Sequence, residues 1–119
     1  SLEDEPARSR IQPEQVEAVA DYIHNYLEES VTVEDLALEC NMSKFYFLRE
    51  FKKATGKTPH QFLVETKMEQ ARVWIRDPDL SLAELAVRLG YTDQSHFSRV
   101  FKGHFGQSPG AYRKQELAQ

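Results

Sequence analysis

The sequence has few of the residues that several common classes of protein depend on. Its 119 residues include one cysteine, Cys40, which excludes an internal disulfide and favours a reducing compartment. No apolar run approaches the roughly 20 residues of a membrane span, and no signal peptide is visible. The chain begins with Ser rather than Met, as a fragment of a longer protein would. Its length suits one small domain, or two subdomains that share a helix.

Residues suited to catalysis or metal binding are also scarce. The four histidines and Cys40 do not stand at the spacings of a metal site. The sequence has no glycine-rich phosphate loop and no nucleophile elbow. Cys40 has no evident activating partner, so we interpret it as a small buried residue at a helix end. We therefore expect no enzymatic activity, no cofactor and no metal.

The net charge of -4 argues at first against nucleic acid, but the charge is unevenly distributed. Residues 1–40 include 11 acidic and 2 basic side chains, a net charge of -9. Residues 41–119 include 8 acidic and 13 basic side chains, a net charge of +5. A basic surface on one part of an acidic domain is enough for local binding of phosphate groups.

The stretch from residue 81 to residue 113 has the pattern of two short helices joined by a tight turn. Polar capping residues and glycines mark the helix ends: Ser81, Gly90, Asp93, Gly106 and Ser108. Glu84 stands three residues after Ser81, which predicts a reciprocal capping box. Apolar residues recur at helical spacing, so the second helix should bury Phe97, Val100 and Phe101. This arrangement indicates a helix-turn-helix.

The same pattern occurs upstream, in residues 32–62. The matched pairs are offset by 49 residues in the first helix and by 50 in the second: Leu36/Leu85, Ala37/Ala86, Phe47/Phe97, Arg49/Arg99, Phe51/Phe101, Lys52/Lys102, Gly56/Gly106 and Pro59/Pro109. The extra residue falls in the turn, where insertions are tolerated and where Asn41 replaces Gly90. Phe51 and Ala54 are expected beside Phe47 in the core. Glu50 replaces Val100, and we expect this departure to loosen the packing or shift the helix.

The sequence resembles the DNA-binding domain of AraC/XylS-type bacterial transcription regulators. The residues that carry the resemblance are Ala86, Gly90, Tyr91, Phe97, Arg99, Phe101, Lys102, Gly106, Ser108, Pro109, Tyr112 and Arg113, with the weaker copy upstream. The resemblance extends from about Gln12 to Arg113. It implies an all-α fold of about seven helices, in which two helix-turn-helix subdomains are joined by a long linker helix, and specific binding to double-stranded promoter DNA.

The resemblance also implies a cytoplasmic, nucleoid-associated regulator in bacteria, with RNA polymerase as a partner and a sensor or dimerisation domain outside this chain. We expect a flexible linker over residues 1–11, a first subdomain over 12–57, a linker helix over 58–76 and a second subdomain over 77–115. A linker helix ending near residue 75 would be about 27 Å long, somewhat under the roughly 34 Å of one DNA turn. That length permits two recognition helices in successive major grooves.

The faces opposite the buried phenylalanines provide the candidate DNA contacts. Arg and Gln can make bidentate contacts with bases, Ser and His can hydrogen-bond to base edges, and apolar side chains can touch thymine methyl groups. The candidate base-reading residues are Phe45, Tyr46, Leu48, Arg49, Gln94, Ser95, His96 and Arg99. The candidate phosphate contacts, which position the protein without reading sequence, are Lys44, Lys52, Lys53, Lys57, Lys67, Arg72 and Lys102.

One alternative is a helical protein-interaction module that has lost contact with DNA. Phe45, Tyr46 and Leu48 favour it somewhat, because three large side chains lie on or beside the first reading face. Steeply salt-dependent affinity for DNA would distinguish the two, since an interaction module releases few counterions.

Overall fold

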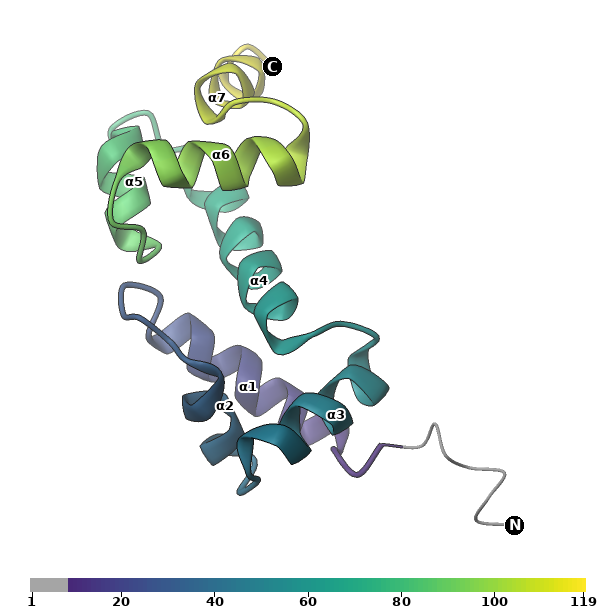
Figure 1. Ribbon diagram of the computed structural model, residues 1–119. Helices are drawn as coiled ribbons and strands as arrows, with labels where there is room; N and C mark the ends of the chain where they lie inside the picture. Colours follow the sequence, from purple (N-terminus) through teal and green to yellow (C-terminus); the bar gives the residue numbers. More distant parts are fainter. Residues whose placement is uncertain (1–8) are drawn as a thin grey trace. The chain divides into compact units, whose positions relative to one another are not determined.

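The computed structural model describes residues 9–119, and this part of the chain is helical throughout, with no strand. Figure 1 shows the helices in chain order: α1 (Pro13–Asn25), α2 (Val33–Glu39), α3 (Lys44–Thr55), α4 (Pro59–Trp74), α5 (Leu82–Arg88), α6 (Gln94–Phe105) and α7 (Pro109–Leu117). The predicted all-α fold of about seven helices is confirmed. None of the described helices is long and apolar enough to cross a membrane.

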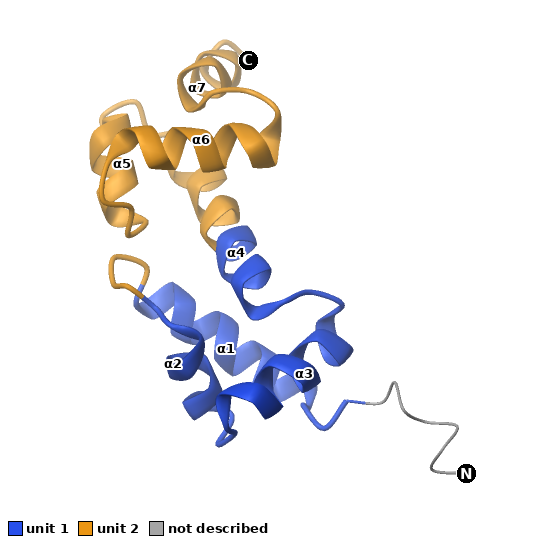
Figure 2. Ribbon diagram, in the orientation of Figure 1, with its two compact units in different colours: residues 1–26, 31–66 blue, residues 27–30, 67–119 orange. Residues whose placement is uncertain are grey.

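The chain forms two compact units, coloured separately in Figure 2. The first unit contains residues up to Tyr26 together with Val31–Thr66. The second contains Leu27–Ser30 and Lys67–Gln119. Helix α4 is therefore divided between the units, and the short segment between α1 and α2 packs with the second unit.

The first unit begins with α1, whose start and apolar stripe follow from its sequence. Pro13 occupies the first turn, where its missing N–H costs nothing, and Val19 and Ile23 are buried. Helix α2 begins with a complete capping box: the Thr32 hydroxyl accepts from the Asp35 N–H, and the Asp35 carboxylate accepts from the Thr32 N–H. These features confirm the predicted helix starts.

The two predicted hairpins are closely equivalent in the structure. Helices α3 and α6 are both 12 residues long and start 50 residues apart, and each ends at a left-handed glycine, Gly56 (φ 76°) or Gly106 (φ 82°). The turns between the paired helices contain left-handed residues too, Asn41 (φ 54°) in the first hairpin and Gly90 (φ 83°) in the second. Asn tolerates this conformation better than most residues, as the sequence predicted.

Each of the two hairpins has an equivalent aromatic contact in its own core. Phe51 meets Phe62 edge to face, with ring centroids 5.1 Å apart and planes at 84°. Phe101 meets Tyr112 at 5.3 Å and 80°. Each member of the second pair is 50 residues beyond its counterpart, and edge-to-face contact is a favoured geometry for aromatic rings. The repeat therefore extends past α3 and α6 into the helices that follow them, α4 and α7.

Four details differ from the predictions. Val100, expected in the core with Phe97 and Phe101, is only half-buried. The Ser81 hydroxyl accepts from the Glu84 N–H, but the Glu84 carboxylate makes no reciprocal bond, so only half of that capping box forms. Ala54, expected in the core, is exposed because it lies where α3 approaches its end. Residues 1–8 of the predicted linker lie outside the described residues. Its last three residues pack against the first unit, with Ile11 buried, so for Ser9–Ile11 the prediction of a flexible linker is corrected.

Candidate nucleic-acid interface

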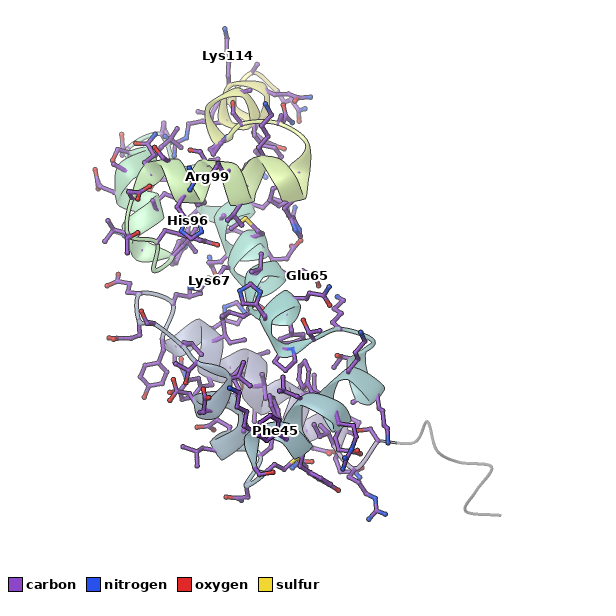
Figure 3. All side chains as sticks on the ribbon, in the orientation of Figure 1. Phe45, Glu65, Lys67, His96, Arg99 and Lys114 are labelled. Carbon is purple, nitrogen blue, oxygen red and sulfur yellow. The ribbon has the colours of Figure 1, made fainter. Side chains whose placement is uncertain are left out.

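The exposed face of α3 is set by the residues that the helix buries. The Ser43 hydroxyl caps α3 by accepting from the Tyr46 N–H. Phe47 is fully buried, and helical geometry then turns Phe45 and Arg49 outward. Phe45 is 80% exposed, which is unusual for a side chain of its size. It is labelled on α3 in Figure 3.

The exposed face of α6 forms in the same way. The Asp93 carboxylate caps the helix by accepting from the His96 N–H at 2.7 Å. Phe97 and Phe101 are fully buried, which turns the opposite side outward, where Figure 3 labels His96 and Arg99. The His96 ring packs edge to face against Tyr91, with centroids 5.1 Å apart, so this imidazole has a defined neighbour although it is exposed.

The structure brings the predicted base-reading residues together on these two helices. In α3, Phe45 and Arg49 are exposed, and Tyr46 and Leu48 are half-buried at the sides. In α6, the four candidates are all exposed: Gln94, Ser95, His96 and Arg99. Glu50 is the only acidic residue of α3 and is buried, while α6 has no acidic residue at all. Neither exposed face therefore carries a carboxylate that would repel DNA.

Apart from Lys67, the predicted phosphate contacts fall into two groups. Lys52 and Lys102 are exposed and make no ion pair within residues 9–119. The others are partly neutralised by carboxylates: Lys44 with Glu34 at 3.0 Å, Lys53 with Glu50 at 3.4 Å, Lys57 with Glu65, and Arg72 with Glu69 at 3.0 Å. The pairs of Lys44, Lys57 and Arg72 are exposed and therefore weak in water, whereas Lys53 is paired with the buried carboxylate of Glu50.

Lys67 needs a correction, because it is buried at 8% exposure and is unsuited to contacting phosphate groups. Its ammonium lies 5.3 Å from the centre of the Tyr91 ring, a cation–π contact within the second unit. Burial lowers the pKa of Lys67. Burial likewise raises the pKa of Tyr91 to about 12, so its phenol stays neutral at physiological pH. The hydrophobic periodicity of α4 predicts that Met68 is buried, but it does not predict that the neighbouring Lys67 is buried as well.

Arg113 has a structural role that the sequence did not reveal. Its Nε donates to the Ile75 carbonyl oxygen at 2.8 Å, and its Nη2 donates to the Leu80 carbonyl oxygen at 2.7 Å. The side chain therefore attaches α7 to the segment between α4 and α5. Its partners are 38 and 33 residues away in the sequence, so no local signal identifies them.

The structure offers little sign of other chemistry. Cys40 is buried, and burial, with Glu39 nearby, raises the pKa of its thiol. A raised pKa reduces the thiolate fraction on which cysteine reactivity depends. Within residues 9–119 no group of three or more His, Cys, Asp or Glu side chains is arranged to hold a metal ion.

Comparison with known sequences places the chain in a family. A model of a helix-turn-helix domain matches residues 36–115. The MmsAB operon regulatory protein of Pseudomonas aeruginosa is 38% identical over 94 residues, which are 79% of this chain and 31% of that protein. The transcriptional activator NphR of a Rhodococcus species is 37% identical over 91 residues, 76% of this chain and 27% of that protein. The chain thus spans about a third of the length of these relatives.

Solved structures agree with the sequence comparison. The DNA-binding domain of the global transcriptional factor AdpA, solved in complex with a target DNA, superimposes with a TM-score of 0.79 at 33% identity. That match covers 87% of this chain and 93% of the other. A DNA-binding transcriptional dual regulator from Escherichia coli K-12 gives a TM-score of 0.83 at 25% identity, covering 93% and 99% of the two chains. The chain belongs to the AraC-type family of helix-turn-helix DNA-binding domains.

Proposed function

We propose that this domain binds double-stranded DNA sequence-specifically and regulates transcription at bacterial promoters, with α3 and α6 as its two reading helices. The observation that carries the proposal is the equivalence of these helices. Both are 12 residues long, begin at a side-chain cap and end at a left-handed glycine. Both present an arginine at the same position, Arg49 or Arg99, on a face without exposed carboxylates. Arginine is the side chain that most often reads guanine in the major groove.

The two helices engage successive major grooves in this proposal. Helix α4 has 16 residues and is therefore about 24 Å long. A linker helix of this length permits contact with successive grooves of a duplex whose turn is about 34 Å. The residues that read bases in this proposal are Phe45, Tyr46, Leu48 and Arg49 on α3, and Gln94, Ser95, His96 and Arg99 on α6. Phosphate groups are contacted by the basic residues that remain accessible: Lys44, Lys52, Lys53, Lys57, Arg72 and Lys102.

The remaining parts of the proposal concern the whole protein. We place a sensor or dimerisation domain outside this chain, because the relatives are about three times as long. RNA polymerase is the proposed protein partner, the location is the bacterial cytoplasm at the nucleoid, and the domain has no catalytic role. The folding boundaries at 12–57, 58–76 and 77–115 also stay a prediction.

A protein-interaction module is the second candidate, and the exposure of Phe45 favours it. Helix α2 exposes Leu38 as well, at 72%. Exposed apolar side chains can mark contacts with protein. They also suit thymine methyl groups, so DNA affinity and its salt dependence decide between the candidates.

A hydroxyl-radical footprint on a duplex selected from a random pool tests the proposal. We expect two protected segments about 10 base pairs apart on one side of the duplex, and an affinity that falls steeply with salt. A single short protected segment would contradict docking in two grooves. Weak, salt-insensitive binding to every duplex would favour the interaction module instead.

A further inference from the structure

Glu50 marks the main chemical difference between the two hairpins. It stands at the position that Val100 has in the second hairpin, and its carboxylate is buried, with 3% of the residue exposed. A buried charge is tolerated only when it is paired and hydrogen-bonded. The expected loosening of the core does not follow, because both carboxylate oxygens of Glu50 have partners.

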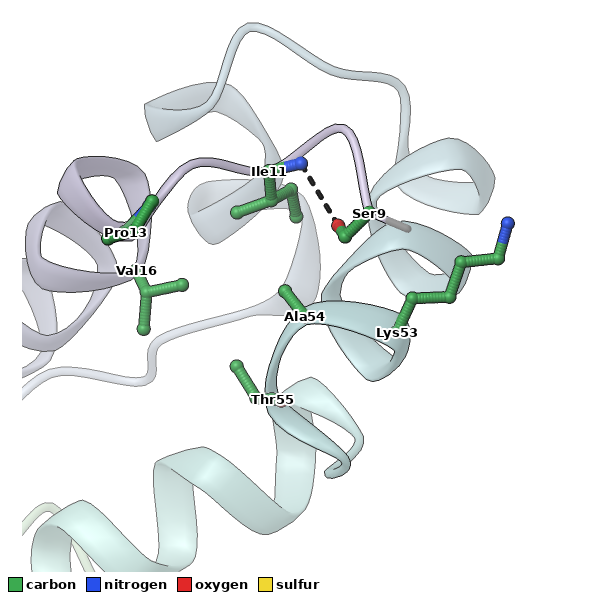
Figure 4. A pocket seen from close by; sticks show the side chains of 7 residues that line it. All are labelled: Ser9, Ile11, Pro13, Val16, Lys53, Ala54 and Thr55. Atoms are coloured by element: carbon green, nitrogen blue, oxygen red, sulfur yellow. Dashed lines mark hydrogen bonds between the residues drawn. The ribbon is translucent and has the colours of Figure 1, made fainter. Parts of the chain in front are cut away.

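The first oxygen of Glu50 holds the segment that precedes α1. Its Oε1 accepts from the Arg10 backbone N–H at 2.9 Å, and the Glu50 carbonyl oxygen accepts from the Ser9 hydroxyl at 2.7 Å. The Ser9 hydroxyl also accepts from the Ile11 N–H at 3.0 Å, which Figure 4 shows beside Lys53 and Ala54 of α3. Ser9, Ile11 and the end of α3 line a groove of about 460 Å³. The segment is thus attached directly to α3.

The second oxygen of Glu50 holds the candidate base-reading arginine. Its Oε2 accepts from Arg49 Nε at 3.3 Å and lies 3.4 Å from the Lys53 ammonium. The hydrogen bond from the Arg10 backbone, followed by those from Arg49 and Lys53, holds the pKa of Glu50 below its usual range. The carboxylate therefore stays charged and keeps both cations at neutral pH.

Arg49 is restrained on two sides and free where it would meet DNA. Its guanidinium carbon lies 5.2 Å from the centre of the Tyr46 ring, while Nε is held by Glu50. The terminal nitrogens Nη1 and Nη2 make no hydrogen bond within residues 9–119, and the side chain is 62% exposed. Arg99 of α6 has neither an ion pair nor a ring partner in that same range. Restraining a side chain in its bound conformation lowers the entropy lost on binding.

We propose that Glu50 is a positioning residue for base reading by α3: it orients Arg49 for contact with one base pair and connects the Ser9–Ile11 segment to that contact. The proposal rests on the proposed function. It makes the first reading helix preorganised and leaves the second adaptable, although both present arginine at the same place. A domain joined ahead of Ser9 would then be connected, through Glu50, to the side chain of Arg49.

The test uses the 119-residue chain, a preferred duplex selected from a random pool, and duplexes changed at single base pairs. Discrimination is the ratio of Kd values between changed and preferred duplexes. Arg49→Ala should reduce discrimination at one base pair by about 5- to 150-fold, the range of a bidentate contact. Glu50→Gln has the same shape but can make only one of the two contacts, so it should reduce discrimination at that base pair by roughly 3- to 10-fold, part of the arginine effect.

The double variant separates positioning from a merely structural role. In an Arg49→Ala background, Glu50→Gln should not change discrimination further. Lys53→Ala is the matched control, because it removes the other cation at the same oxygen, and it should weaken all duplexes by one common factor. Circular dichroism melting confirms that each variant is folded at the assay temperature. If Glu50→Gln does not fold, Glu50→Met replaces it, since an apolar side chain of similar volume often substitutes for a buried ion pair.

Several outcomes would overturn the inference, and each differs from failure of the proposed function. If Glu50→Gln keeps full discrimination while Arg49→Ala loses it, Arg49 reads DNA without help from Glu50. If Glu50→Gln reduces discrimination equally in the Arg49→Ala background, it acts through the fold. If Arg49→Ala leaves discrimination intact, Arg49 does not read a base pair and Glu50 does not position it for that purpose. Absence of binding to any duplex at low salt would instead refute the proposed function itself.

Discussion

Gly90 passes so close to Leu27 that a β-carbon added at Gly90 would lie 2.6 Å from the Leu27 carbonyl oxygen. The same added atom would lie 3.2 Å from the Glu29 carbonyl oxygen. The segment between α1 and α2 therefore packs directly on the turn of the second hairpin. Gly90 is needed there for space as well as for its left-handed φ of 83°.

Gly90→Ala should consequently destabilise the domain more than alanine at another left-handed glycine. Gly106 is the matched control in the same unit, since its φ is 82° and nothing lies within 4 Å of an added β-carbon. Gly106→Ala should cost about 1–2 kcal/mol for the backbone conformation. Gly90→Ala should cost about 2–5 kcal/mol, because overpacking against backbone adds to that term. Urea unfolding measures both values, and equal costs would contradict the close approach.

Phe101→Ala should cost about 3–5 kcal/mol in free energy of unfolding, because the side chain is fully buried and packs on Tyr112. Phe51→Ala should behave similarly in the first unit, where Phe62 replaces Tyr112. Phe45→Ala is the control in α3, and as an exposed residue it should change stability by no more than about 0.5 kcal/mol. Thermal and urea unfolding provide the comparison. A parent-like melting curve for either core variant would show that the buried face is assigned wrongly.

Features encoded by neighbouring residues were predictable from the sequence. The caps at Thr32 and Ser43, the left-handed turn at Asn41 and the helix stops at Gly56 and Gly106 all depend on residues within four positions of each other. Hydrophobic period then placed the four core phenylalanines, and the internal repeat added an independent check. These signals predicted the hairpins and the outward faces of α3 and α6, while the complete fold of about seven helices was expected from the resemblance to the AraC-type family.

Features that depend on distant partners were not predictable. Lys67 looked like a surface cation on α4, but the second unit covers it, with Tyr91 against its ammonium. Glu50 was expected to loosen the core packing or shift the helix, but its carboxylate accepts a hydrogen bond from the backbone N–H of Arg10, 40 residues earlier. In both cases the burial of a charge is decided by contacts that no local pattern contains.

Lys67→Met should raise the melting temperature at neutral pH and leave DNA affinity unchanged. Burial lowers the pKa of Lys67 in the folded state, so the folded chain holds its proton less tightly than the unfolded chain does. Below the folded pKa the cost of burying the charge is present in full. The Tyr91 ring offsets part of that cost and methionine avoids it, since Met fills irregular apolar sites well.

The pH dependence gives this prediction a second measurement. In the parent chain, Lys67 should make stability rise with pH between its folded pKa and the ordinary pKa of lysine. Tyr91, whose folded pKa is raised from 10.0 to about 12, opposes that rise only near and above pH 10, where its phenol ionises in the unfolded chain and not in the folded one. The rise should therefore be smaller in Lys67→Met. If Lys67→Met instead weakens binding to all duplexes and reduces the salt slope of DNA affinity by about one, Lys67 contacts a phosphate group after all.

Arg99 and Lys102 should separate base reading from phosphate binding on α6. Both are exposed, so neither substitution should unfold the domain. If Arg99 reads a guanine, Arg99→Ala should cost about 1–3 kcal/mol on the preferred duplex and relax the preference at one position. Lys102→Ala should instead weaken all sequences similarly and lower the salt slope by about one.

The measurement is a pair of binding titrations, on preferred and scrambled duplexes, at several salt concentrations. Arg99 has no partner of the kind that Glu50 provides to Arg49, so its contact with a base must be ordered during binding. We therefore expect Arg99→Ala to lose less discrimination than Arg49→Ala does at its own position. Equal weakening of both duplexes by Arg99→Ala would make Arg99 a phosphate contact. Specificity in the second hairpin would then reside first in Gln94, Ser95 and His96, at the start of α6.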